Sequence, residues 1–205
     1  MATPEFSEVW RHIGEIIGSG ITVRTLVRGA PNLLQWSHDG VAVTTRKGRE
    51  SLPRELFESV WNALQETTIL SPGQFPGTAR YRSTSVASIL ALLPYVDFTV
   101  YPRTTLFLVD HIFSNTEISR TFGVGTLSGI RFAGPAGNPH LVVFITEAAP
   151  GDTGEPRGTH PYRDRWQDGI LYYTGEGLSG PQTMTKGNLA LSASIEQDAP
   201  VYGFQ

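Results

Sequence analysis

The sequence contains no cysteine, and that absence removes several kinds of chemistry at once. Disulfide frameworks, thiolate zinc fingers and thiol catalysis all depend on cysteine side chains. Long apolar runs are missing too, because no segment approaches the roughly 18 apolar residues that a membrane span requires. The first residues also lack the pattern of a secretory signal peptide. We therefore expect a cytoplasmic protein with no membrane partner.

An excess of positive charge is also missing. Lys and Arg number 16 against 19 Asp and Glu, so the formal net charge is −3. This balance excludes a uniformly basic nucleic-acid coat protein, and any nucleic-acid contact must be a local patch. Hydrophobic residues make up 40% of the chain and charged residues 17%, which excludes a wholly disordered chain. The 22 Gly and 14 Pro favour many short elements over long helices.

Sequence motifs for cofactor binding and hydrolysis are absent or incomplete. There is no Walker motif, and the glycine spacing of Phe122–Gly129 differs from that of a dinucleotide fingerprint. The five histidines are isolated, so no metal site is predicted. Asp110 and His111 are explained as well by a turn at a strand end as by a catalytic dyad, and no Gly-x-Ser-x-Gly elbow is present. We predict no catalytic residue, metal or cofactor, and a binding module ranks above a hydrolase.

The first 97 residues have the pattern of a small α+β domain. Apolar residues at helical spacing predict a helix over Pro4–Gly18, and short alternating runs over residues 22–45 predict an antiparallel sheet. A second helix is expected to begin with Ser51 as its N-cap, and a third covers Ser83–Leu93. This order is similar to a winged-helix-like module. A contact with DNA, a packing platform and a dimer contact all remain open for it, and its neutral charge favours the platform.

From residue 98 onward, short β-type runs alternate with loops rich in Gly and Pro. We place the domain boundary near Tyr95–Phe98 and expect residues 98–205 to form a bent sheet or partly closed barrel. One segment of this half, Lys186–Ser194, has a helical pattern. The predicted strands are Phe98–Tyr101, Thr105–Val109, Gly129–Phe132, His140–Thr146, Ile170–Tyr173 and Val201–Phe204.

The densest group of functional side chains lies between residues 160 and 180. Tyr162 and Tyr173 bracket Asp164, so a loop folded back on the following strand would form a slot with aromatic walls and a carboxylate at its floor. Such a slot suits a planar heterocycle with an amino group, such as cytosine, because a carboxylate accepts a hydrogen bond from cytosine N4. The alternative is an ordinary hairpin, in which either Tyr172 or Tyr173 faces the core.

Two motifs in this region resemble the SRA (SET- and RING-associated, or YDG) domain. The first begins at Asp168 and reads Asp-Gly-Ile-Leu-Tyr-Tyr-Thr-Gly-Glu-Gly, and the second begins at Gln182 and reads Gln-Thr-Met-Thr-Lys-Gly-Asn-Leu-Ala-Leu. The Gly-Glu-Gly and Lys-Gly-Asn variants are most similar to the SRA-type domains of bacterial McrA-like, modification-dependent restriction endonucleases. The strong similarity covers residues 162–191, a vaguer one covers residues 123–144, and the first 98 residues lie outside it.

The resemblance implies a PUA-like bent barrel that holds a 5-modified cytosine flipped out of duplex DNA. Two departures from the family are Pro181, where an Asp is usual, and a Tyr162-to-Tyr173 spacing one residue shorter than in eukaryotic relatives. The shorter spacing leaves the base-reading acid open between Asp164, which we favour, and Asp168. The implied contacts are Tyr162 and Tyr173 around the base, Asp164 on its Watson–Crick edge, and Thr174 with the Gly175 backbone beside the 5-substituent.

Base contacts alone give modest affinity, so phosphate contacts are expected as well. Each basic candidate for such a contact is also open to a simpler interpretation as a solvated surface charge. The candidates near the predicted pocket are Arg157, Arg163, Arg165 and Lys186, and those in the first half of the chain are Arg46, Lys47 and Arg49.

These features predict the recognition part of a modification-dependent restriction system. The expected partner is double-stranded DNA with 5-methyl- or 5-hydroxymethylcytosine, with a nuclease domain either covalently linked or separate. A homodimer is also left open. The sequence has no HNH scaffold and no convincing PD-(D/E)xK pattern, so a nuclease activity of the chain itself ranks lower. The alternatives are a modification-dependent endonuclease or glycosylase in its own right, and a PUA-like module that binds RNA or nucleotides.

Overall fold

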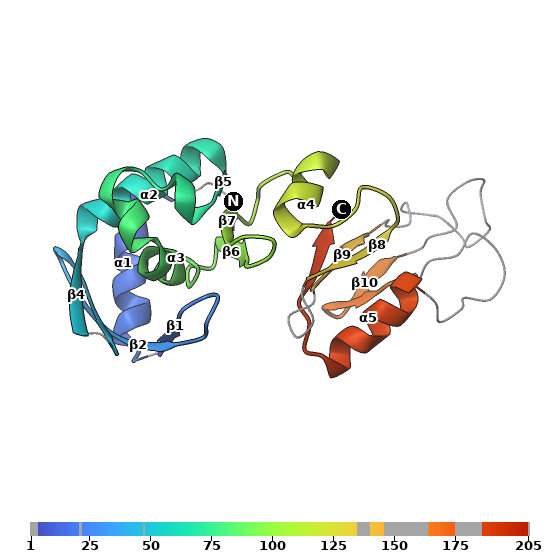
Figure 1. Cartoon of the computed structure of the whole chain (residues 1–205), viewed down its shortest axis with the longest axis horizontal. Helices are drawn as coiled ribbons and strands as arrows, with labels where there is room; N and C mark the ends of the chain where they lie inside the picture. Colours follow the sequence, from blue (N-terminus) through green and yellow to red (C-terminus); the bar gives the residue numbers. More distant parts are fainter. Residues whose placement is uncertain are drawn as a thin grey trace. The chain divides into compact units, whose positions relative to one another are not determined.

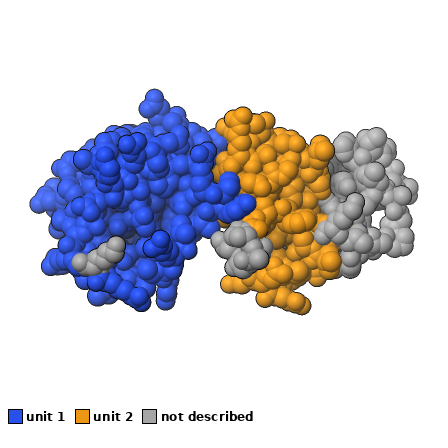
Figure 2. All heavy atoms as spheres, in the orientation of Figure 1, with its two compact units in different colours: residues 1–113 blue, residues 114–205 orange. Residues whose placement is uncertain are grey.

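The computed structural model describes residues 4–20, 22–46, 48–134, 140–145, 164–174 and 186–204. Helices and strands both occur among the described residues of each half of the chain, which confirms the expected α+β class. The chain divides into two compact units, residues 1–113 (unit 1) and residues 114–205 (unit 2), coloured separately in Figure 2. In the described part of the chain, no helix is long and apolar enough to cross a membrane.

The division between the units falls at residues 113 and 114, whereas the sequence predicted residues 97 and 98. Main-chain pairing explains the difference. Residues 96–108 contain two strands that form a small antiparallel sheet with a strand near residue 70, in the order β5-β7-β6. The segment after residue 97 is therefore tied to unit 1 by hydrogen bonds. The three strands are β5 (Ile69–Leu70), β6 (Val96–Thr99) and β7 (Thr105–Leu108).

Unit 1 begins with a helix, a four-stranded antiparallel meander and further helices (Figure 1). The apolar stripe of the first helix, including Trp10 and Ile13, is buried in one core with Phe57 and Trp61 of the second helix, as helical spacing predicts. The elements are α1 (Phe6–Gly18), β1 (Val23–Arg24), β2 (Pro31–Ser37), β3 (Gly40–Thr45), β4 (Gly48–Pro53), α2 (Arg54–Thr67), η1 (Pro72–Gln74), η2 (Gly77–Arg82) and α3 (Ser83–Leu90).

One prediction for unit 1 is wrong: Ser51 does not cap the second helix. Ser51 lies in β4, where it pairs with Ala42 of β3, and α2 begins only after Pro53. Here the pairing of Ser51 with the neighbouring strand outweighs the preference of serine for the N-cap position of a helix. The third helix also ends at Leu90, three residues before the predicted end at Leu93.

Unit 2 contains a three-stranded sheet in the order β12-β9-β8, a separate hairpin and two helices (Figure 1). Strand β12 runs parallel to β9, and α5 contacts β8 and β9. The described strands form no closed barrel. The bent-barrel interpretation of this half of the chain and the winged-helix interpretation of the first half both stay predictions. The elements are α4 (Asn115–Phe122), β8 (Ile130–Ala133), β9 (His140–Phe144), β10 (Arg165–Gln167), β11 (Ile170–Tyr172), α5 (Lys186–Glu196) and β12 (Val201–Phe204).

The helix α4 was not predicted from the sequence, although a signal for it is present. Ser114 precedes the helix, and its hydroxyl accepts a hydrogen bond from the Glu117 backbone N–H at 3.2 Å. The Glu117 carboxylate accepts in return from the Ser114 backbone N–H at 2.8 Å. This reciprocal pair is a capping box, and the Ser-x-x-Glu spacing that produces it is readable from the sequence.

Candidate functional site

The hairpin β10–β11 organises the predicted site in unit 2. Trp166 pairs with Leu171 across the two strands, and the chain reverses at Asp168 and Gly169. These turn residues have φ angles of 52° and 77°, the left-handed region that an Asp-Gly pair tolerates in two-residue hairpin turns. Asp168 is exposed at this turn. Its position is therefore that of a turn residue, as the sequence favoured.

Asp164 lies at the opposite end of the hairpin, directly before β10. It is 1% exposed. Its Oδ1 atom accepts a hydrogen bond from the Thr174 backbone N–H at 2.6 Å. A buried carboxylate is costly unless it is hydrogen-bonded, and a bond from a backbone N–H to an ionised acceptor is among the stronger ones. A hydrogen bond thus joins Asp164 and Thr174, two of the predicted base-binding residues, at the end of the hairpin opposite the turn.

Tyr173 is the tyrosine of the neighbouring pair that packs on the core. Its ring contacts the buried cluster of Ile130, Leu141 and Val143, and its hydroxyl donates to the Gly129 carbonyl at 3.4 Å. Tyr172, on the other face of the strand, is 44% exposed. The structure therefore places Tyr173 next to Asp164 and Thr174, and the Tyr173 ring is half-buried against the sheet.

The other predicted residues are dispersed. Arg165 begins β10 and Lys186 begins α5, while Arg46 and Arg49 lie exposed at the β3–β4 turn of unit 1. The Arg49 guanidinium donates to Gln35 at 2.9 Å. Five predicted residues lie outside the described part of the chain: Tyr162, Gly175, Arg157, Arg163 and Lys47.

A hollow of about 360 Å³ in unit 2 was not anticipated from the sequence. It is lined by residues of the Gly-Val-Gly-Thr-Leu-Ser-Gly segment before β8 and by the glycine of the Lys-Gly-Asn motif at the start of α5. Gly129 connects this hollow to the predicted site, because its carbonyl bonds Tyr173 and its neighbours Ser128 and Ile130 line the hollow. The lining residues are Gly125, Leu127, Ser128, Ile130, Arg131, Phe132 and Gly187.

Arg131 gives this hollow a positive charge. The side chain is buried, and the guanidinium donates to the Ser128 and Thr126 carbonyls, both at 3.0 Å, and to Asn115 Oδ1 at 2.7 Å. It also lies over the Phe144 ring at 4.1 Å from the ring centre. Burial lowers the pKa of Arg131 from its ordinary value. Among the described residues no carboxylate pairs with it, so three neutral acceptors and an aromatic face hold the cation in place.

A family comparison decides what this part of the chain is. Residues 110–205 match the family model described as the ScoMcrA-like SRA domain. The chain carries an SRA domain of the McrA-like type. Neither a curated protein nor a solved structure gives a significant match to the chain.

The SRA match covers all of unit 2 and a few residues before it, and it stops short of most of unit 1. It therefore confirms the resemblance inferred from the two motifs near Asp168 and Gln182. It also extends that resemblance back to residue 110, so α4 and the sheet of unit 2 belong to the SRA domain. Across the described residues, no cluster of His, Asp and Glu side chains is suited to hold a metal ion.

Proposed function

We propose that the SRA domain binds double-stranded DNA containing a 5-modified cytosine and holds that base flipped out of the duplex. The observation that carries the proposal is the buried Asp164 carboxylate, fixed by the Thr174 backbone N–H beside the Tyr-Thr-Gly motif. Tyr173 and Tyr162 would contact the faces of the base, and Thr174 with Gly175 would border its 5-substituent.

The acid accounts for the choice of cytosine. Cytosine N4 is a hydrogen-bond donor, whereas thymine presents the O4 acceptor at the same position. A carboxylate therefore attracts cytosine and repels thymine, although both 5-methylcytosine and thymine carry a 5-methyl group. The interaction is stronger in a buried site because the local dielectric is lower than that of water.

The energies of the individual contacts set the expected size of the preference. Flipping a base costs a few kcal/mol, and aromatic stacking returns about 1–3 kcal/mol per base. A polar base contact contributes about 1–3 kcal/mol. Burial of one methyl-sized group adds only about 0.8 kcal/mol, which is about fourfold in affinity. We therefore expect strong selection for cytosine over thymine and a smaller preference for the modified base.

Fluorescence anisotropy with matched duplexes tests the proposal. The duplexes carry cytosine, 5-methylcytosine, 5-hydroxymethylcytosine or a mispaired thymine at one position. The native chain should prefer a modified cytosine and discriminate against thymine. Asp164→Asn should lose most of the cytosine-over-thymine preference, because an amide presents both a donor and an acceptor.

Asp168→Asn is the matched control for this substitution. It makes the same acid-to-amide change in the same hairpin, and Asn tolerates the left-handed backbone of the turn. The control should retain the native preferences. Equal binding of all four duplexes by the native chain would refute base recognition, and an equal effect of both substitutions would exclude Asp164 as the reading residue.

The proposal extends to phosphate contacts and to a role in restriction. Arg165 and Lys186 of the SRA domain, with Arg157 and Arg163 nearby in sequence, are the proposed backbone contacts, and Arg46, Lys47 and Arg49 are proposed for unit 1. The chain would act as the recognition part of a McrA-like system, and a nuclease domain, linked or separate, would cut the DNA.

A further inference from the structure

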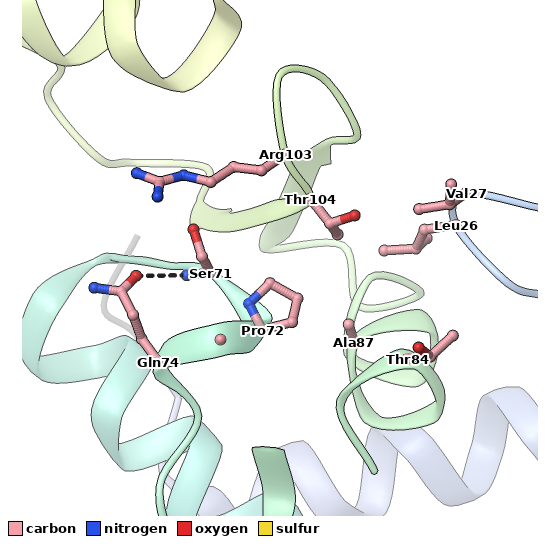
Figure 3. Close-up of a pocket in the computed structure, with 10 residues that line it drawn as sticks. Leu26, Val27, Ser71, Pro72, Gln74, Thr84, Ala87, Arg103 and Thr104 are labelled. Carbon is pink, nitrogen blue, oxygen red and sulfur yellow. Dashed lines mark hydrogen bonds between the residues drawn. The ribbon is translucent and has the colours of Figure 1, made fainter. Parts of the chain in front are cut away.

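A second hollow, of about 540 Å³, lies in unit 1. Four segments far apart in the sequence meet around it: the β1–β2 connection, η1, α3 and the β6–β7 loop (Figure 3). Its volume is within the range of pockets that hold small molecules or single groups of larger ones. The lining residues are Leu26, Val27, Ser71, Pro72, Gly73, Gln74, Thr84, Ala87, Arg103 and Thr104.

The lining combines an apolar wall with hydrogen-bond donors and one cation. Figure 3 shows Leu26, Val27 and Ala87 on one side, with Arg103 extending above Gln74 on the other. The Gln74 Oε1 atom accepts from the Ser71 backbone N–H at 3.0 Å, so the amide nitrogen of Gln74 remains as a donor. The Arg103 side chain forms no hydrogen bond or ion pair with any other residue that the structure describes.

The loop that carries Arg103 is held against η1 by a chain of hydroxyl groups. The Thr105 hydroxyl donates to the Arg103 carbonyl at 3.2 Å. Because that proton is used, the Ser71 hydroxyl is the donor in its 3.1 Å bond to the Thr105 hydroxyl. The backbone on two sides of the hollow is therefore fixed before any ligand arrives, which lowers the entropic cost of binding.

Charge is distributed unevenly around the hollow. Residues 22–31, 71–90 and 99–105, which supply its lining, contain five arginines and no Asp or Glu. Arg82 pairs with Glu50 at 2.9 Å, and Arg24 donates to the Gly29 carbonyl. The acidic residues of unit 1 lie on other segments, including Glu8 and Glu15 on α1 and Glu55, Glu58 and Glu66 on α2. Of the five arginines, Arg103 lines the hollow itself, and no acidic residue does.

We infer that this hollow binds a nucleotide, with the phosphate on Arg103 and the sugar or base against Leu26, Val27 and Ala87. An arginine fork and neighbouring donors match phosphate oxygens, and the apolar wall matches the flat remainder of a nucleotide. The nucleotide is either one unit of a DNA strand or a free mononucleotide. The inference goes beyond the proposed function because the site lies in unit 1 and does not read cytosine modification.

Two substitutions test this inference in the full chain. Arg103→Gln removes the charge. Gly73→Leu adds a bulky side chain at a residue that lines the hollow. The change is tolerated by the backbone, because a Cβ added to Gly73 meets no heavy atom within 4 Å and its φ lies outside the left-handed region. The control is Arg120→Gln, which removes an exposed arginine from α4 of the SRA domain. Binding is measured by anisotropy with a short unmodified duplex and by calorimetric titration with deoxycytidine monophosphate.

We expect Arg103→Gln to weaken duplex binding about tenfold, the value of one charged hydrogen bond. Gly73→Leu should weaken duplex binding as well, because its side chain occupies space that the nucleotide needs. Arg103→Gln should also reduce the slope of log affinity against log salt by about 0.9, because one phosphate contact is lost. Arg120→Gln should leave both quantities unchanged. If the native chain also binds the mononucleotide and both variants lose it, the ligand is a free nucleotide, and if only duplex binding falls, it is a DNA strand.

The inference is overturned if both variants bind duplex and mononucleotide as the native chain does, or if Arg120→Gln has the same effect. Thermal unfolding shows whether Gly73→Leu is folded, and Gly73→Ala, which adds only the Cβ, should bind as the native chain does. Repeating the titration with a 5-methylcytosine duplex separates the two proposals. Loss of nucleotide binding in unit 1 lowers the affinity for the unmodified and the modified duplex by the same factor. Failure of base recognition instead abolishes only the difference in affinity between the two duplexes.

Discussion

At the scale of single residues, the hairpin of the SRA domain gives two aspartates opposite environments. Asp164 is buried and bonded to Thr174, while Asp168 is exposed in a turn with positive φ. The sequence could predict the turn, because Asp-Gly is a strong local signal. It could not predict which of Tyr172 and Tyr173 faces the core, since strand alternation fixes only that they differ. That choice depends on the cluster around Ile130, which is distant in the sequence.

His140 provides a residue-scale prediction about pH. It is buried, and burial lowers the pKa of its imidazole, while its hydrogen bond to the Phe122 carbonyl acts in the opposite direction with a smaller effect. Below the ordinary pKa of about 6.5, the unfolded chain then binds a proton that the folded chain does not. Stability contributed by His140 is therefore complete above that pH and falls as the pH is lowered toward the folded pKa.

His140→Gln should flatten this dependence, because glutamine donates to the same carbonyl without titrating. The measurement is the midpoint of thermal unfolding at pH 7.5 and at pH 5.5 for both proteins. The native chain should lose more stability over this interval than the variant does. Equal losses would contradict the assignment of the dependence to His140.

At the scale of elements, most helices and strands with a clear local pattern were predicted, with α4 and its capping box as an exception. Elements fixed by pairing with distant residues were missed. The stripe of α1 was readable because helical periodicity extends over its whole length. Strand β4 was not, because Gly48–Pro53 has no strong strand pattern and is fixed by its pairing with β3. The two-residue strand β1 is likewise fixed by its pairing with β2.

Helix α4 allows a direct test of its capping box. Ser114→Ala removes the hydroxyl that accepts from Glu117, and it should lower the free energy of unfolding by about 1 kcal/mol. Thr116→Ala is the control, because Thr116 is exposed on the same helix and alanine has the higher helix propensity. Urea unfolding of both variants measures the difference. A control variant that is destabilised as much as Ser114→Ala would show that the cap contributes nothing.

At the scale of the whole molecule, each unit has its own hydrophobic cluster. The large cluster extends from Phe6 to Leu108 and lies entirely within unit 1, and the cluster of Ile130, Leu141 and Val143 lies within unit 2. Composition and the change of pattern along the chain predicted two domains. They did not locate the division, because β6 and β7 have the same short β-type pattern as the strands of unit 2.

Two fragments test the position of the division. Residues 1–113 should fold alone and unfold cooperatively, since they hold the complete large cluster. Residues 1–97 lack β7 with Leu106 and Leu108, which are 0% and 2% exposed, and should lose fixed packing. Near-ultraviolet circular dichroism, which reports on the buried Trp10 and Trp61, distinguishes the two outcomes. Native-like spectra for both fragments would place the boundary at residue 97 after all.

The parallel pairing of β12 with β9 has a consequence for synthesis of the chain. Val201 pairs with Leu141, so the middle strand of the SRA sheet lacks one neighbour until the segment around residue 201 has left the ribosome. Strand β9 is buried along four of its five residues, and its open edge is an apolar template for other strands during that interval. Unit 1 finishes its own sheets far earlier in translation. Chaperone dependence and aggregation of nascent chains should therefore originate in the SRA domain.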